Sequence, residues 1–308
     1  MNSEITNYEQ LIYQLCQKDP SLVVMTAENR AAIRNIPGML GERFVDVGIC
    51  EMTLAGAAAG MALRGKKPII HALAMFLTGR AFEFVRTDIG YPKLPVKLVG
   101  YIPGILSTAN GATHQAVDDV GLMMGIPGMN VFAPADIDDL LLCLPQIIAS
   151  DEPYYIRYTD NPKIINHKTQ FEIGKAEQIK DGINVTIFSY GPMLKQGLLA
   201  SKKLEELGIS VRLFNLRTVK PIDTEAILNA AHETQLIVTL EDHFESNGLY
   251  SAVCQILNRN KLFCPVLPMG LKDKYFKPAH NIDDILLHEG LAGSLIANRI
   301  YDEFKRSR

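Results

Sequence analysis

Two side chains suited to proton chemistry stand out in the first half of the 308-residue sequence. Glu51 follows the short apolar segment RFVDVGIC (43–50) and precedes a run of small residues (54–62), so we expect it at the start of a helix. His114 lies in the glycine-containing segment STANGATHQ (107–115). A carboxyl group at a helix start can bond a ligand nitrogen, or it can simply complement the positive end of the helix dipole. A loop histidine can donate or shuttle a proton, or it can bond a backbone carbonyl.

Other charged residues favour anion binding rather than proton transfer. Arg157 ends the apolar segment YYIRY (154–158), and a guanidinium fork suits a phosphate or sulfonate group. The alternative is an ordinary surface arginine at the end of a strand. Arg30 and Arg34 would add positive charge at a substrate entrance. The segment LEDHF (240–244) places two acids beside a histidine, but no third ligand stands at a suitable spacing. We therefore expect a structural or interface role there, and no metal site.

Short apolar runs alternate with helical patterns along almost the whole chain, which predicts mostly parallel sheets covered by helices on both faces. The runs are continuously apolar, as strands buried on both faces should be. The expected strands are Leu22–Thr26, Phe44–Val47, Pro68–Leu73, Val96–Tyr101, Asn130–Ala133, Tyr155–Tyr158, Val185–Ser189, Ser210–Leu216, Leu236–Leu240 and Pro265–Met269. The expected helices are Tyr8–Gln17, Glu51–Arg64, Arg80–Ile89, Val117–Met124, Ile137–Ala149, Leu194–Leu207, Thr224–Ala231, Leu249–Asn258 and Leu291–Phe304.

A polar stretch interrupts this alternation and divides the chain. Residues 160–181 contain the turn-forming segment NPK (161–163), and the alternation restarts after them. We predict a first domain over residues 1–165, a linker over 166–181 and a second domain over 182–308. The expected fold class is therefore α/β, with two domains that each consist of a mostly parallel sheet flanked by helices.

Composition excludes several classes of protein. The net charge of −3 gives no basic surface for nucleic acid, and no apolar run is long enough to span a membrane. The five cysteines show no metal-binding or disulfide spacing, which is typical of a reducing compartment. The segment MNSEITNYEQ (1–10) lacks the features of a signal peptide. We expect a soluble, cytoplasmic protein without nucleic-acid or membrane partners.

Three segments around these candidates resemble a known enzyme family. The segment VGICEMTLAGAAAGMALRGKKPII (47–70) is similar to the pyrimidine-binding domain of thiamine-diphosphate enzymes of the transketolase group, in which a strand and Gly-Ile-Ala-Glu precede a small-residue helix. GATHQ (111–115) resembles the family's Gly-x-Thr-His-Gln loop. Residues 76–83 resemble the segment that packs against the cofactor's aminopyrimidine ring, and the region from Ile183 resembles the family's C-terminal domain. The resemblance implies a pyrimidine-binding domain followed by a transketolase C-terminal domain.

The resemblance implies that this chain binds thiamine diphosphate. Glu51 would hydrogen-bond the aminopyrimidine ring nitrogen and favour the imino tautomer, whose exocyclic nitrogen removes the thiazolium C2 proton, while the cofactor carries the carbanion chemistry. Phe76 and Phe82 would form the apolar wall against the ring, with Phe76 the better match. We expect Ile49 and Glu28 to lie on the cofactor side of the site as well.

The substrate side of the pocket departs from the family pattern. His114 would face the substrate and donate a hydrogen bond or a proton during carbon–carbon bond cleavage. Arg157 matches a substrate-phosphate arginine, and Arg30 would lie near the entrance. Asn110 stands where the family usually has an acid that recognises a sugar hydroxyl, and Ile102 stands near the place of a histidine in transketolases of sugar-phosphate metabolism. The donor and acceptor therefore stay open.

The diphosphate side of the site is expected from another chain. Full-length members of the family have an additional N-terminal domain, in which a Gly-Asp-Gly motif and a downstream Asn hold Mg²⁺, and this sequence has no such motif. We therefore expect half of a split transketolase, in an α2β2 complex whose other subunit holds Mg²⁺. The complex would transfer a two-carbon ketol unit between sugars or sugar phosphates.

Two alternatives to this function stay open. One is the β-subunit of a 2-oxo-acid dehydrogenase E1 component, against which the Gly-x-Thr-His-Gln loop argues. The other is a non-catalytic assembly partner, against which the presence of both Glu51 and His114 argues.

Overall fold

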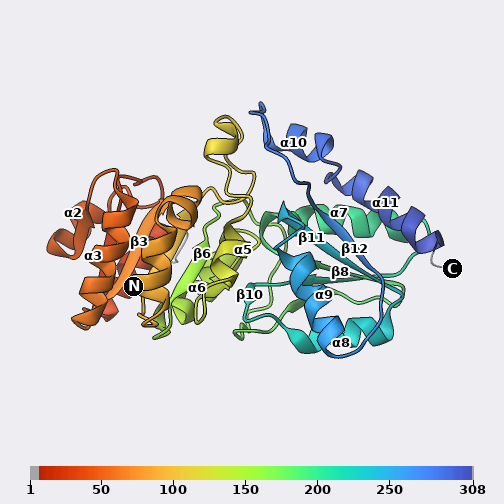
Figure 1. Cartoon of the computed structure of the whole chain (residues 1–308), viewed down its shortest axis with the longest axis horizontal. Helices are drawn as coiled ribbons and strands as arrows, with labels where there is room; N and C mark the ends of the chain where they lie inside the picture. Colours follow the sequence, from red (N-terminus) through yellow and green to blue (C-terminus); the bar gives the residue numbers. More distant parts are fainter. Residues whose placement is uncertain (1–6, 307–308) are drawn as a thin grey trace.

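The computed structural model describes residues 7–306 as two α/β units that lie side by side (Figure 1). Each unit is built on its own sheet, in strand order β10-β5-β6-β4-β3-β1-β2 for the first and β12-β11-β8-β9-β7 for the second. The first sheet consists of β1 (Leu22–Thr26), β2 (Phe44–Asp46), β3 (Lys67–Leu73), β4 (Lys97–Tyr101), β5 (Asn130–Phe132), β6 (Tyr154–Arg157) and β10 (Thr218–Lys220). The second consists of β7 (Glu177–Lys180), β8 (Val185–Ser189), β9 (Val211–Asn215), β11 (Leu236–Phe244) and β12 (Val266–Leu271). The predicted α/β class is confirmed, because all pairs are parallel except those of the edge strands β7 and β10.

Helices cover both faces of the first sheet, which explains its continuously apolar strands. In β3, Ile69 packs into the core under α1, α2 and α6, whereas its neighbour Ile70 packs into the core under α3, α5 and the helical segment 76–90. The helices of this unit are α1 (Tyr8–Lys18), α2 (Ile36–Leu40), α3 (Glu51–Leu63), α4 (Phe82–Phe84), α5 (Asp119–Met124) and α6 (Ile137–Ala149). Short helical turns are η1 (Gly41–Arg43), the π-helical η2 (Phe76–Arg80) and η3 (Val85–Gly90), and η4 (Gly111–Thr113).

The second sheet is covered in the same way. Helices α7, α10 and α11 share one hydrophobic core on one face, and α8 and α9 lie on the other face (Figure 1). Their bounds are η5 (Gly191–Met193), α7 (Leu194–Glu206), α8 (Thr224–Glu233), α9 (Leu249–Arg259), α10 (Ile282–His288) and α11 (Gly293–Arg306). In residues 7–306, none of the helices has the length and apolarity needed to cross a membrane.

The boundary between the units is less simple than a linker between two domains. The expected linker 166–181 includes β7, which pairs antiparallel with β9 at the edge of the second sheet. In addition, β10 leaves the second unit and pairs antiparallel with β5 of the first sheet. One hydrophobic core also runs through both units, from residues of α3 to residues of α8 and α9. Both edge strands are short and lack an apolar run, so the sequence pattern did not predict them.

Candidate active site

Glu51 is held at the first turn of α3 by the chain reversal after β2. The strand ends at Asp46, and Gly48 turns the chain with a φ of +74°, in the region that favours glycine. Cys50 is the N-cap of α3, and Glu51 is its first residue. The alanine-rich face of α3 packs onto the core, and the Glu51 side chain becomes only 2% exposed. A carboxyl group is thereby buried at the positive end of a helix dipole.

Arg80 connects Glu51 to the aromatic ring of Phe76. Its Nη1 lies 2.9 Å from Oε2 of Glu51, and its guanidinium carbon lies 4.0 Å from the centroid of the Phe76 ring. The Phe76 ring meets the His114 ring edge-on, with centroids 5.2 Å apart. Oγ1 of Thr113 lies 2.8 Å from Nδ1 of His114. A carboxyl group, an aromatic face and an imidazole are thus joined into one surface, the Glu51 edge, defined by Glu51, Arg80, Phe76 and His114.

Two other predicted cofactor residues, Phe82 and Ile49, lie in different surroundings. Phe82 is half-buried and packs against the core of the first unit, whereas Phe76 contacts Arg80 and His114. Ile49 is 73% exposed on the turn that precedes Glu51. No role was predicted for Arg80. Its signal was the four-residue spacing from Phe76, which places two side chains on one face of a helix.

Strand β1 brings Glu28 and Arg30 to the same sheet edge as this turn. Both are exposed, and Glu28 has a φ of +68°, which is unusual for a residue with a side chain. Oδ1 of Asp46 accepts the backbone N–H groups of Glu28 at 3.1 Å and Gly48 at 2.9 Å, and Oδ2 accepts Nε–H of Arg30 at 3.0 Å. Partial burial would raise the pKa of Asp46, but these hydrogen bonds outweigh it and hold the pKa below its usual value. Asp46, which was not predicted as a site residue, therefore holds Glu28, Gly48 and Arg30 together by hydrogen bonds.

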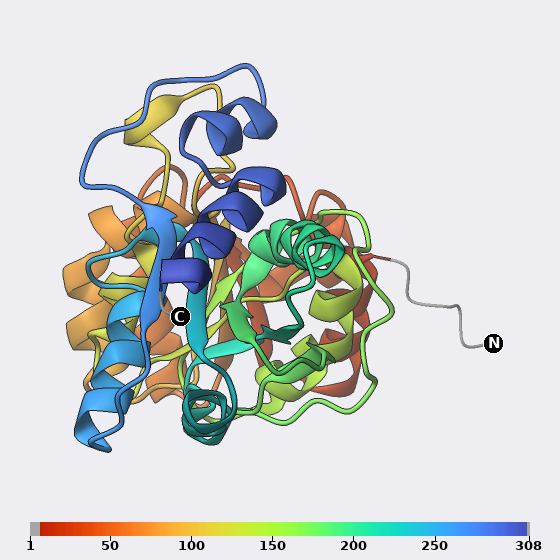
Figure 2. The same cartoon turned by 90° about the vertical axis from the view of Figure 1, so that its right-hand side faces the viewer.

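The loop that carries His114 rests on a segment of the second unit. The backbone N–H of Ala279 donates to the carbonyl of Thr108 at 3.0 Å. Gly111 has a φ of +68°, and a Cβ atom there would lie 3.0 Å from Pro278. Both views show this yellow loop beside the blue segment that precedes α10 (Figure 2). The second unit therefore helps to position the histidine.

The two other predicted substrate residues lie in different surroundings. Asn110 is exposed on the loop, where a ligand can reach it. Arg157 is only 2% exposed: its Nε lies 2.9 Å from Oδ2 of Asp119, its Nη1 lies 2.8 Å from Oδ1 of Asp242, and its guanidinium lies against the ring of Tyr190. Contrary to the expectation of a phosphate-binding arginine, the structure places Arg157 in a buried ion-pair network between the two units.

The acids and the histidine of β11 complete this network. They lie on β11, which continues to Phe244. Glu241 accepts two backbone N–H groups from the first turn of α9, at 2.7 and 3.0 Å. Nε2 of His243 accepts the backbone N–H of Gly121 at 3.0 Å, and its Nδ1 lies 2.8 Å from the carbonyl oxygen of Phe244. These contacts agree with the structural role predicted for the segment.

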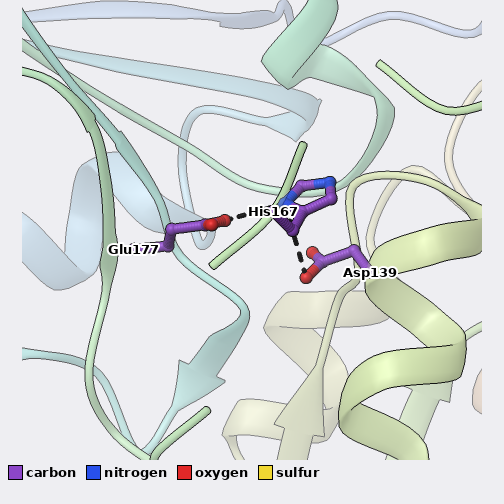
Figure 3. A group of neighbouring side chains, drawn as sticks. All are labelled: Asp139, His167 and Glu177. Atoms are coloured by element: carbon purple, nitrogen blue, oxygen red, sulfur yellow. Dashed lines mark hydrogen bonds and ion pairs between the residues drawn. The ribbon is translucent and has the colours of Figure 1, made fainter. Parts of the chain in front are cut away.

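A second buried charge network includes the segment that was expected to be a linker. Asp139, His167 and Glu177 offer ligand atoms within 4.8 Å of one another, as a metal site would require (Figure 3). The His167 ring, however, already lies between Asp136 at 3.0 Å and Glu177 at 2.8 Å. Arg217 lies 2.6 Å from Asp139 and 3.1 Å from Glu177. The arrangement is therefore an ion-pair network with its own cations.

The protonation of His167 follows from this network. Burial by itself would lower the pKa of the imidazole, but hydrogen bonds to Asp136 and Glu177 and the nearby Asp139 outweigh it and raise the pKa to about 10. The same contacts lower the pKa of both hydrogen-bonded carboxyl groups, against the effect of their burial. A charged imidazolium thus joins the first unit to the second.

Comparison with known proteins gives consistent matches over both units. Residues 5–161 match the model of the transketolase pyrimidine-binding domain, and residues 174–287 match that of the transketolase C-terminal domain. The 6-deoxy-6-sulfo-D-fructose transketolase subunit SqwH of Clostridium sp. is 38% identical, over 84% of this chain and 81% of that protein. One subunit of the apulose-4-phosphate transketolase of Phocaeicola vulgatus is 31% identical, over 92% of each chain. A solved split-gene transketolase, described as an inactive β4 tetramer, superposes with a TM-score of 0.87 at 32% identity and covers 98% of this chain and 97% of that one.

Proposed function

The chain belongs to the transketolase family, and from this membership we propose that it is the pyrimidine-side subunit of a split, thiamine-diphosphate-dependent transketolase. The observation that supports this function best is the Glu51 edge. It combines a buried carboxyl group, the aromatic ring of Phe76 with the Arg80 guanidinium 4.0 Å from its centroid, and an imidazole that meets the same ring edge-on. These are the groups that a flat aminopyrimidine ring and a neighbouring carbonyl substrate require.

Each residue of the Glu51 edge has a separate role in this proposal. When bound, thiamine diphosphate supplies the carbanion chemistry. Glu51 hydrogen-bonds the ring nitrogen and selects the tautomer, and Phe76 provides the stacking face, while Phe82 packs against the core of the first unit. His114 holds or moves a proton at the substrate oxygen. Ile49 and Glu28 lie at the rim of the cofactor side.

We assign Mg²⁺ and the diphosphate to a partner subunit. Among residues 7–306, the group with metal-ligand spacing is the Asp139–His167–Glu177 network, whose carboxylates already pair with His167 and Arg217. The similar split-gene transketolase is described as an inactive β4 tetramer. Both observations support a complex with an N-terminal, diphosphate-binding subunit, for which we propose the stoichiometry α2β2 and a cytoplasmic location.

The proposed reaction moves a two-carbon ketol unit from a ketose donor to an aldose acceptor. The two curated relatives are named for a sulfonated and a phosphorylated ketose. Both sugars carry an anionic group, so we propose a donor of this class for the present chain. The exposed Asn110 and Arg30 are the candidates for contacts with it, and Asn110 brings hydrogen bonding without the charge of an acid.

Native purification tests the function. The chain is isolated from its source cells, and whatever accompanies it is identified by mass spectrometry and tested with thiamine diphosphate, Mg²⁺ and a panel of sulfonated and phosphorylated ketoses. We expect a partner with the Gly-Asp-Gly and Asn pattern, bound cofactor, and two-carbon transfer. A chain that purifies alone and binds no cofactor with Mg²⁺ would contradict the proposal. Lipoamide-dependent decarboxylation would instead identify a dehydrogenase β-subunit.

A further inference from the structure

Arg80 makes, within this chain, the two contacts that the proposed function assigns to the aminopyrimidine ring. Its Nη1 donates to Oε2 of Glu51 at 2.9 Å. Its planar guanidinium covers the ring of Phe76, with the central carbon 4.0 Å from the ring centroid. A flat, nitrogen-containing ring that bonds the same carboxyl group and stacks on the same face would need the space that the guanidinium fills.

The two occupants also require opposite behaviour from Glu51. A guanidinium is always charged and only donates hydrogen bonds, so it pairs with a carboxylate that accepts. The unprotonated ring nitrogen of an aminopyrimidine accepts, so it requires a carboxyl group that donates. We propose that Arg80 is a latch, which occupies the aminopyrimidine position in the free subunit and has to leave before the cofactor ring can bind.

The surroundings of Arg80 allow such a movement. Its side chain is 42% exposed, and among residues 7–306 its sole ion pair is the one with Glu51. It is the last residue of the π-helical turn η2, and π-helical turns occur frequently at functional sites. Because the guanidinium is partly exposed, it can move into solvent, and a bound ligand that hydrogen-bonds Glu51 would keep this buried carboxyl group paired. The latch keeps a buried carboxyl group paired while the cofactor is absent.

Cofactor binding, measured by calorimetry on the assembled complex with Mg²⁺, tests the latch, which rests on the proposed function. Arg80→Met keeps a long apolar side chain but removes the ion pair and the planar group. Arg80→Lys keeps the charge alone. Arg86→Met is the control, because Arg86 is exposed on the next π-helical turn and has no contact with Glu51. We expect Arg80→Met to bind thiamine diphosphate roughly 3- to 30-fold more tightly, Arg80→Lys to be intermediate and Arg86→Met to be unchanged.

The direction of the change in thiamine diphosphate affinity decides whether Arg80 is a latch. Weaker binding by Arg80→Met, or by Arg80→Lys if the Met variant does not fold, would overturn the latch and make Arg80 a cofactor ligand. Unchanged affinity in both folded variants would also overturn it. If the wild-type complex binds thiamine diphosphate in these cases, the proposed function stands without the latch. If neither the wild type nor any variant binds it, the function and the latch fall together.

Discussion

Two arginine–carboxylate pairs with almost equal distances lie in different surroundings in this protein. Arg80 lies 2.9 Å from Glu51, and Arg157 lies 2.8 Å from Asp242. The Arg80 side chain is 42% exposed and pairs with one carboxylate, whereas that of Arg157 is 2% exposed and also pairs with Asp119. Opening the first pair leaves one buried carboxyl group, which a bound ligand can take over, whereas breaking the second leaves two buried acids. Burial and the number of partners therefore separate the pair that we propose to open during cofactor binding from the pair that holds the two units together.

The largest effect is expected at the Glu51 edge. In the assembled complex, Glu51→Gln should lower the rate of ketol transfer by roughly 10²- to 10⁴-fold, because an amide cannot replace the carboxyl group at the ring nitrogen. Steady-state kinetics measures the change. Glu83→Gln, at an exposed acid on α4, should leave the rate unaltered. An unaltered rate in Glu51→Gln would favour the non-catalytic assembly partner.

A substitution of Arg157, in the buried ion-pair network between the units, should affect stability instead. Arg157→Met is expected to lower the free energy of unfolding by about 3–5 kcal/mol, because two buried acids lose their shared counter-charge. Urea denaturation measures the loss, and Arg259→Met, at the exposed end of α9, is the control. Unchanged stability together with a higher KM for phosphorylated donors would instead support a substrate-binding Arg157.

The network around His167 predicts a pH dependence of stability. Its pKa is raised from 6.5 to about 10, so the folded protein holds this proton more tightly than the unfolded chain does. The stabilisation is therefore complete below pH 6.5 and is lost as the pH rises toward 10. The difference in unfolding free energy between wild type and His167→Gln should shrink across this range. The exposed His288→Gln is the control, and a difference that stays constant with pH would contradict the assignment.

The smallest effects are expected for substitutions of Phe76 and Phe82, and they differ between the two residues. Phe76→Leu should weaken cofactor binding by about 2- to 10-fold, because it removes the stacking face. Phe82→Leu should lower stability by up to about 1.5 kcal/mol and leave the affinity unchanged, because this half-buried side chain packs against the core. Calorimetry and urea denaturation separate the two effects. The reverse result would exchange their roles.

Local signals were sufficient to predict most of the elements and the position of Glu51 at the start of a helix. A glycine turn followed by small residues defines the start of α3, and buried parallel strands are continuously apolar. The environment of Arg157 was not predictable in this way, because its two acids lie 38 and 85 residues away. His167 was assigned to a linker for the same reason, since its partner Asp136 lies 31 residues away. The sequence identifies a charge, but the tertiary fold determines whether that charge is buried and paired.

Strand β10 has a consequence for how such chains can recombine. It is encoded within the second unit but forms the edge of the first sheet, and Nζ of Lys220 bonds the carbonyl oxygens of Met124 at 2.8 Å and Ile126 at 2.6 Å. In a chimera of two homologues joined at residues 166–176, the edge strand of the first sheet would therefore come from the other homologue. So would the lysine at position 220 that bonds the two carbonyl oxygens. Only an exchange of both units together would keep β10 and Lys220 with the first unit that they contact.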